Sequence, residues 1–111
     1  MNISTRKIGE IFAIDIEGKL NTTTSTPALQ ELLQYLESSP DKVLISLAPL
    51  DFVSSAGLRV ILRVAKHVRG HKGQLKVSGA HGVVKEVLEI SGFDSLLDLY
   101  EEEELALSSY A

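Results

Sequence analysis

Apolar and polar residues alternate along the chain between Glu10 and Glu17. The apolar side of this alternation carries Phe12, Ile14 and Ile16. A period of two residues is typical of a β-strand with one buried face. We therefore predict a strand here, and we expect residues 3–7 to pair with it as a short antiparallel edge.

A helical period follows the first strands. Thr26 and Pro27 predict a helix start, because threonine caps helices and proline's missing amide hydrogen is not needed in the first turn. One apolar stripe follows at helical spacing: Leu29, Leu32, Leu33 and Leu36. Pro40 marks the predicted end of this helix.

The centre of the chain combines a buried strand with a second helix. Val43–Leu47 is an almost uninterrupted apolar run, as expected for a strand covered on both faces. The segment Asp51–Arg59 opens a helix that we expect to end at Gly70. Its predicted core stripe is Leu58, Ile61, Leu62, Ala65 and Val68.

The last part of the chain continues this alternation. We predict a strand over residues 75–77, a third helix over residues 84–88 that closes at Gly92, a strand over Leu97–Tyr100 and a terminal helix from Glu101. Strands that alternate with helices predict an α/β fold. We expect a mixed, mostly parallel sheet of about five strands with about four helices, in which the first strand pairs antiparallel.

Composition restricts the class of protein. A chain of 111 residues, 44% of them hydrophobic, suits a single domain over residues 1–111. It contains no cysteine, which excludes disulfides, thiolate zinc sites and cysteine nucleophiles. No long uncharged apolar run and no apolar N-terminal stretch occurs. We therefore expect a cytoplasmic protein that does not contact the membrane directly.

Charge is distributed unevenly around a formal net charge of −4. The segment Phe52–Gly73 holds no acid but several basic residues, whereas acids cluster over residues 101–104. A solvated helix face is the plain interpretation of the basic run. The alternative is that Arg59, Arg63 and Lys66 steer an acidic partner. We do not expect nucleic acid as a partner, because no aromatic residues for base stacking interrupt the basic residues.

Two serines stand where the second predicted helix begins, after the central strand. In parallel sheets this edge presents loops and helix starts to partners. A helix cap needs only one serine, so one of Ser54 and Ser55 is not required for capping. A helix start also tolerates a phosphate, and Arg59 lies at the i,i+4 spacing that could hold a phosphate on Ser55. Gly57, unfavourable inside a helix, suggests a close approach to the backbone.

The sequence does not predict an enzyme. Catalysis needs a nucleophile with a base, paired carboxylates or a metal cluster, and none occurs at useful spacing. His67 and His71 are interpreted as surface residues and His81 as a helix-start residue. The glycines match no phosphate-cradling or dinucleotide motif, so we expect no cofactor and no metal.

Three motifs, spread over nearly the whole chain, resemble one family. The stretch Asp51–Leu62, DFVSSAGLRVIL, is similar to the signature of STAS-domain proteins, which include anti-sigma factor antagonists and sulphate-transporter regulatory domains. Gly18–Asn21 resembles the family's Gly-x-Leu-Asp turn, and Lys85–Gly92 resembles the helix before its last strand. The resemblance implies the STAS fold and a protein that binds an anti-sigma factor with serine kinase activity until phosphorylation ends the binding. A serine phosphatase is implied as the second partner.

The resemblance also implies the site. The family's phosphoacceptor falls on Ser55, with Ser54 as second choice, while Ser54 and Asn21 stand where the family usually has acids. The implied partner-binding residues are Asn21, Thr22, Ser54, Ser55, Ala56, Gly57, Leu58 and Arg59. We expect a monomer or weak dimer. The alternative is a constitutive STAS binding subunit of a transporter or larger signalling assembly, which the two neutral replacements favour.

Overall fold

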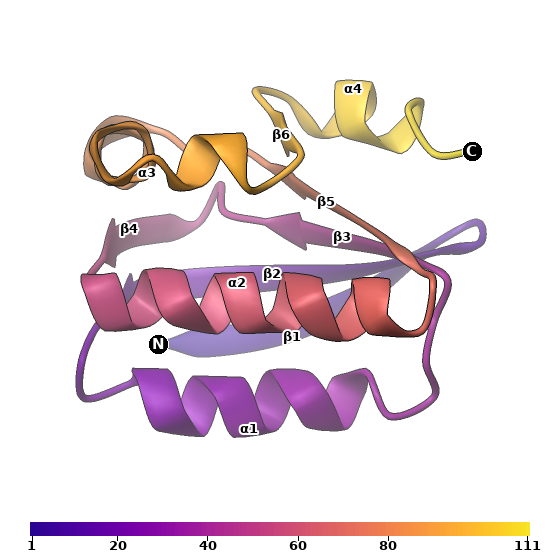
Figure 1. The fold of residues 1–111 in the computed structure, drawn as a ribbon, viewed down its shortest axis with the longest axis horizontal. Coiled ribbons are helices and arrows are strands. Elements are labelled where there is room, and N and C mark those ends of the chain that lie inside the picture. The colour runs from indigo at the N-terminus through magenta and orange to yellow at the C-terminus, as the bar shows by residue number, and fades with distance from the viewer.

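A mixed sheet and the helices that pack on it make up the protein (Figure 1). The computed structural model describes residues 1–111. In chain order the elements are β1 (Asn2–Ile8), β2 (Ile11–Leu20), α1 (Ser25–Tyr35), β3 (Lys42–Ser46), β4 (Leu50–Val53), α2 (Ser55–Gly70), β5 (Gln74–Ser78), α3 (Gly82–Ser91), the 3-10 turn η1 (Phe93–Ser95), β6 (Leu99–Tyr100) and α4 (Glu103–Leu107).

The sheet has six strands, of which β1 alone pairs antiparallel. Five of the strands follow the order β1-β2-β3-β5-β6. The remaining strand, β4, pairs in parallel with the last residues of β2. The predicted α/β class, the four helices and the antiparallel first strand are therefore confirmed. The sequence pattern did not predict β4, because its residues follow the central strand after only a short turn.

The main core lies on one face of the sheet, under α1, α2 and α3. Ile14, Ile45 and Val77 lie in neighbouring strands on this face and are completely buried. Ala13 and Leu44 face the other way, where Ala106 of α4 completes a second, smaller cluster. Ala13 lies on the side of β2 opposite to the predicted apolar side of Phe12, Ile14 and Ile16, and it is buried because α4 covers it.

The start of α1 differs from the prediction. The helix begins at Ser25, not at Pro27, and its first turn is organised by the turn before it. The Asn21 Oδ1 accepts hydrogen bonds from the amides of Thr23 at 2.9 Å and Thr24 at 3.1 Å. Pro27 still lies in the first turn, where its missing amide hydrogen has no helical partner.

The end of α1 and the apolar stripe of α2 also differ in detail. The first helix ends at Tyr35, well before Pro40. Four of the five predicted stripe residues of α2 are buried, and Leu62 is half-buried. Val60 and Val64 are buried as well, because α2 packs both on the sheet and beside α1. The buried face of α2 is therefore wider than the stripe predicted from its period.

The C-terminal elements are shorter than predicted. The strand predicted from Leu97 begins at Leu99, because Leu97 packs into the core after η1 instead of pairing with β5. The terminal helix begins at Glu103, two residues after the predicted start. Gly92 ends α3 with a left-handed backbone (φ 78°), as its position predicted. No helix of the protein is both long and apolar enough to cross a membrane.

Candidate partner-binding site

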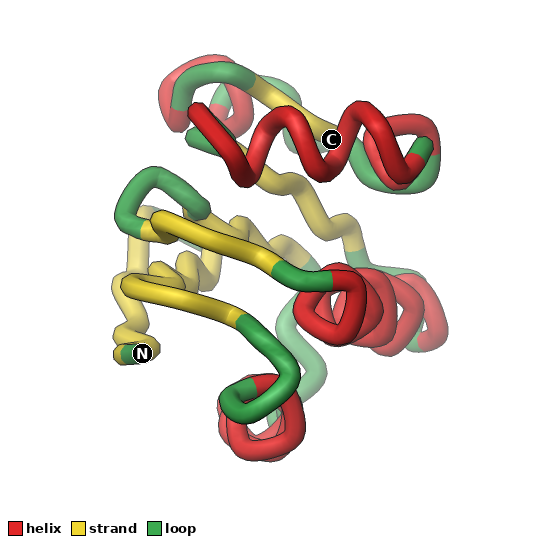
Figure 2. The backbone as a smooth tube through the Cα atoms, turned by 90° about the vertical axis from the view of Figure 1, so that its left-hand side faces the viewer, coloured by secondary structure: helices red, strands yellow, loops and turns green.

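The end of β2 places the two predicted site segments next to each other. Leu20 pairs with Val53 of β4, and the Leu20 carbonyl oxygen accepts a hydrogen bond of 2.9 Å from the Ser54 amide. The loop after β2 and the start of α2 therefore lie at the same end of the molecule. Figure 2 views the protein from this end and shows the loops that lead into α1 and α2.

Gly57 makes this close packing possible. A Cβ atom on Gly57 would lie 2.5 Å from the Leu20 oxygen and 2.8 Å from Val53 Cγ2, distances that real Cβ atoms do not show. The predicted close approach to the Gly57 backbone is confirmed, and the approaching group is the protein's own β2. The glycine thus has a structural role, which keeps the start of α2 fixed against the sheet.

The two serines have different roles in the structure. Ser54 is the N-cap of α2, and its Oγ accepts a hydrogen bond from the Gly57 amide at 3.2 Å. Ser55 is the first helical residue, is exposed, and has a hydroxyl group with no hydrogen-bond partner within the protein. The cap therefore uses the first serine and leaves the second available to solvent.

The loop after β2 is organised by side-chain oxygens. In addition to the Asn21 bonds, Thr24 Oγ1 donates to the Lys19 carbonyl at 2.9 Å. Thr24 was not among the predicted site residues, although threonine three residues after asparagine is a recognisable turn pattern. An aspartate at position 21 would accept the same bonds, so Asn21 preserves the turn and removes one negative charge.

The predicted partner-binding set divides into a surface part and a buried part. Ser55, Arg59 and Thr22 are exposed, and Asn21, Ser54 and Ala56 are half-buried. Gly57 and Leu58 are buried, Leu58 with 2% of its surface exposed. These two residues face the core, so the accessible part of the predicted set is the other six residues, and their contact with a partner stays a prediction.

The charges near the site are unpaired. Arg59, Arg63 and Lys66 are exposed on α2, and none of them takes part in an ion pair. The structure contains five such pairs, and all of them lie on other elements. These basic side chains on α2 therefore have no carboxylate partner within the protein, and the positive end of the helix dipole lies near them.

The histidines have structural contacts. The ring nitrogen Nε2 of His81, at the start of α3 as predicted, lies 2.8 Å from the Ala48 carbonyl oxygen. His71 is half-buried and its Nε2 lies 3.1 Å from the Pro40 oxygen, whereas His67 is exposed, with the two rings 5.7 Å apart. His71 is therefore less exposed than predicted, because it closes the turn between α2 and β5.

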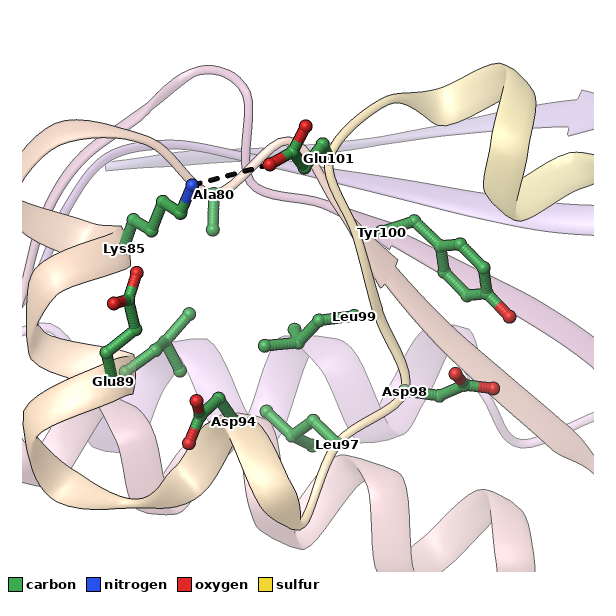
Figure 3. A pocket seen from close by; sticks show the side chains of 10 residues that line it. Ala80, Lys85, Glu89, Asp94, Leu97, Asp98, Leu99, Tyr100 and Glu101 are labelled. Carbon is green, nitrogen blue, oxygen red and sulfur yellow. Dashed lines mark ion pairs between the residues drawn. The ribbon is translucent and has the colours of Figure 1, made fainter.

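A separate pocket of about 450 Å³ lies between α3 and β6 (Figure 3). Leu88, Leu97 and Leu99 form its apolar wall, and an ion pair of 3.5 Å between Lys85 and Glu101 lies at its edge. The side chains of Asp98 and Tyr100 point away from it. None of its lining residues belongs to the predicted site.

Comparison with known proteins agrees with this architecture. The STAS domain family model matches residues 2–106. BtrV of Bordetella bronchiseptica, whose name assigns it to the anti-sigma factor antagonists, is 33% identical over 110 residues, covering 99% of this chain and 95% of the relative. The chain therefore belongs to the STAS-domain family.

Solved structures with low sequence identity share the fold. An anti-sigma factor antagonist from Mycobacterium paratuberculosis superposes with a TM-score of 0.88 at 18% identity, covering 97% of this chain and 92% of that one. SpoIIAA, an anti-sigma factor antagonist solved in its unphosphorylated form, gives a TM-score of 0.69 at 13% identity, with 96% of each chain covered. These two likenesses confirm the STAS fold.

Proposed function

We propose that this protein is an anti-sigma factor antagonist controlled by phosphorylation of Ser55. In the unphosphorylated state it binds an anti-sigma factor that is also a serine kinase, through the surface around the start of α2. A serine phosphatase restores the active form. The proposed setting is the cytoplasm, and the proposed state is a monomer or weak dimer.

One observation carries this proposal: Ser55 offers a free hydroxyl at the start of a helix of 16 residues, while Ser54 is used as the cap. Phosphorylation of Ser54 would replace the cap bond to Gly57. Phosphorylation of Ser55 would leave that bond in place and would put the phosphate beside the positive end of the helix dipole. The geometry therefore favours Ser55 over Ser54.

The relatives support the same function. BtrV is named as an anti-sigma factor antagonist, and the similarity to this chain covers nearly its whole length. SpoIIAA is described in an unphosphorylated form, which presupposes a phosphorylated one. The chain retains a serine at the position that the resemblance marks as the phosphoacceptor. Asn21 keeps the hydrogen bonds of the loop beside it, so the neutral replacement leaves the site's shape intact.

A phosphate on Ser55 is a sufficient switch without refolding. It adds about −1.5 to −2 charges and three acceptor oxygens. If the interface covers Ser55, desolvating these charges costs several kcal/mol, and each 1.4 kcal/mol lowers affinity about tenfold. We therefore expect phosphorylation to weaken partner binding about a hundredfold or more.

The test is intact-mass analysis of the protein after incubation with each anti-sigma factor kinase of the same organism and ATP. Wild type, Ser54→Ala and Ser55→Ala are compared. The expected result is one added phosphate in wild type and Ser54→Ala, and none in Ser55→Ala. Binding of the same kinase is measured by calorimetry before and after modification.

Two results would contradict the proposal. The first is the absence of both binding and phosphate in all three forms. The second is constant co-purification with a transporter or larger assembly that Ser55→Ala does not change, which would establish the constitutive binding subunit instead.

A further inference from the structure

Helices α1 and α2 run side by side, and both begin at the end of the molecule that carries Ser55 (Figure 1). Between their first turns lies a groove of about 250 Å³. Its apolar floor is formed by Leu29 of α1 and by Ala56 and Val60 of α2. Leu29 and Ala56 are half-buried, and Val60 is buried with 5% of its surface exposed. Arg59 and Arg63 line the same groove.

The two arginines lack internal counter-ions. They are one helical turn apart, at the i,i+4 spacing, so their guanidinium groups follow the same edge of α2. The segment Phe52–Gly73 contains no acid that could neutralise them along the helix. On α1 the one carboxylate is Glu31, which accepts a hydrogen bond of 3.0 Å from Tyr35.

This arrangement is unusual for a chain with a net charge of −4. Where the protein uses basic side chains for its own structure, it pairs them: Arg6 binds two carboxylates, and Lys76 binds Asp98 at 2.6 Å. Arginine is also the cation that binds carboxylates with two parallel hydrogen bonds. A groove with apolar floor and unpaired arginines is complementary to a ligand that carries both apolar groups and carboxylates.

We propose that the groove between α1 and α2 binds an acidic amphipathic segment of the partner protein. Two carboxylates of that segment bind Arg59 and Arg63, and an apolar side chain between them packs on the half-buried Leu29 and Ala56. The partner's identity rests on the function proposed above, whereas the chemistry of its segment rests on this groove. A protein segment fits better than nucleic acid, because no aromatic residue lines the groove for base stacking.

The groove also gives phosphorylation a route to the partner. Ser55 and Arg59 are one turn apart, so a phosphate on Ser55 lies within reach of the Arg59 guanidinium. The phosphate and the partner's carboxylate would then compete for the same arginine. In this mechanism phosphorylation withdraws one of the two anchors of the partner in addition to repelling it.

A titration with a synthetic peptide tests the groove independently of any kinase. The probe is a short helical peptide with two glutamates at i,i+4 spacing around a leucine, and its matched control has lysines in place of the glutamates. Backbone amides of the isotope-labelled protein are followed by NMR. We expect shifts at Leu29, Ala56 and Val60 with the acidic peptide, none with the basic one, and an affinity that falls as salt rises.

Charge reversal provides the second comparison. Arg59→Glu with Arg63→Glu should weaken the acidic peptide at least tenfold, whereas Lys7→Glu should leave it unchanged, because Lys7 is an exposed, unpaired residue of β1. In protein phosphorylated on Ser55, peptide binding should weaken, and the loss should be smaller when Arg59→Gln has already removed the shared anchor.

The outcomes separate this inference from the proposed function. Equal binding of acidic and basic peptides, shifts confined to other elements, or binding of single-stranded RNA in place of the peptide would overturn the groove. A kinase that phosphorylates Ser55 and binds the doubly reversed variant with unchanged affinity would overturn the groove while the proposed function stands. If the acidic peptide binds selectively but no kinase of the organism binds the protein or phosphorylates Ser55, the groove stands and the proposed function fails.

Discussion

Charged side chains are paired in one region of the molecule and unpaired in another. On the side of the sheet that the C-terminal segment covers, Arg6 of β1 forms ion pairs with Asp15 at 2.7 Å and with Glu103 of α4 at 2.6 Å. Lys76 forms an ion pair with Asp98. On α2, the side chains of Arg59, Arg63 and Lys66 form no ion pair within the protein. Paired charges hold an element in place, whereas unpaired ones retain their interaction capacity for another molecule.

The paired side also shows the electrostatic consequences of its contacts. Hydrogen bonds from Arg6 lower the pKa of Glu103, and the hydrogen bond to Asp98 raises the pKa of Lys76. Burial raises the pKa of Tyr110, whose hydroxyl donates to the Val43 carbonyl. These contacts attach the C-terminal segment to the sheet face that the larger helices leave uncovered. We call residues 103–110 with their contacts to β1, β2 and β3 the C-terminal clasp.

The largest expected effect tests whether the start of α2, whose charged side chains are unpaired, is held rigidly against the sheet. Gly57→Ala should lower the free energy of unfolding by about 2 kcal/mol, because overpacking a filled site typically costs 1–3 kcal/mol. The Leu20 oxygen cannot retreat from the new Cβ without weakening its bond to the Ser54 amide. Urea unfolding measures the change.

A second glycine of the same helix provides the control. Gly70 has no heavy atom within 4 Å of the place a Cβ would occupy. Gly70→Ala should therefore be neutral or stabilising by a few tenths of a kcal/mol, since alanine is the better helix former. Equal destabilisation by both substitutions would show that the close contact with Leu20 has no energetic importance.

The next effect concerns the C-terminal clasp. Arg6→Met should destabilise the protein by about 1.5 kcal/mol, because it removes charge-assisted hydrogen bonds to two carboxylates that are only partly exposed. Hydrogen exchange should accelerate first in α4, whose main ionic attachment is lost. Lys85→Met is the matched control, because its pair with Glu101 is exposed and should change stability by less than about 0.5 kcal/mol. Intact protection of α4 in Arg6→Met would contradict this prediction.

The two serines allow the sharpest comparison within one site. Ser54→Ala should cost about 1 kcal/mol of unfolding free energy, because it removes the cap bond to Gly57. Ser55→Ala should change stability by less than about 0.5 kcal/mol, because its hydroxyl bonds to nothing in the protein. Thermal denaturation of both variants side by side decides the matter. If Ser55→Ala were the more destabilising of the two, Ser55 would be the structural serine and the assignment of the phosphoacceptor would fail.

Much of the fold follows from local patterns. The central strand, the α2 start and the Gly92 helix end were predictable, because each depends on residues that are close together in sequence. The burial of Ala13 was not predictable from its strand, since it depends on α4, which Arg6 holds through a contact 97 residues away. The start of α1 was missed because a turn of hydrogen bonds at Asn21, not the Thr26-Pro27 pair, organises the first helical residues.

For the candidate site, the positions of its residues in the fold were predictable, whereas their packing was less so. The placement of Ser54 and Ser55 at a helix start is confirmed, because capping is a local property. Leu58 was assigned both to the helix core and to the partner surface, and its burial shows that the core assignment was correct. The neighbour of Gly57 could not be identified from the sequence, because the pairing of β4 with β2 is a long-range contact.

The smallest expected effect follows the titration of Glu103. Since Arg6 lowers its pKa in the folded protein below the ordinary value of 4.5, this carboxylate stabilises the fold above that value. As pH falls through the lowered pKa, the carboxylate is protonated and the contribution is lost. We therefore expect wild type to exceed Glu103→Gln by a few tenths of a kcal/mol near pH 7, because the pair is partly exposed. The difference should shrink as the solution is acidified below the ordinary value.

Urea unfolding of the two proteins across this pH range measures the contribution of Glu103, because both proteins retain Asp15 and Arg6. A difference that grows toward acid pH would show that Glu103 is not stabilised by Arg6.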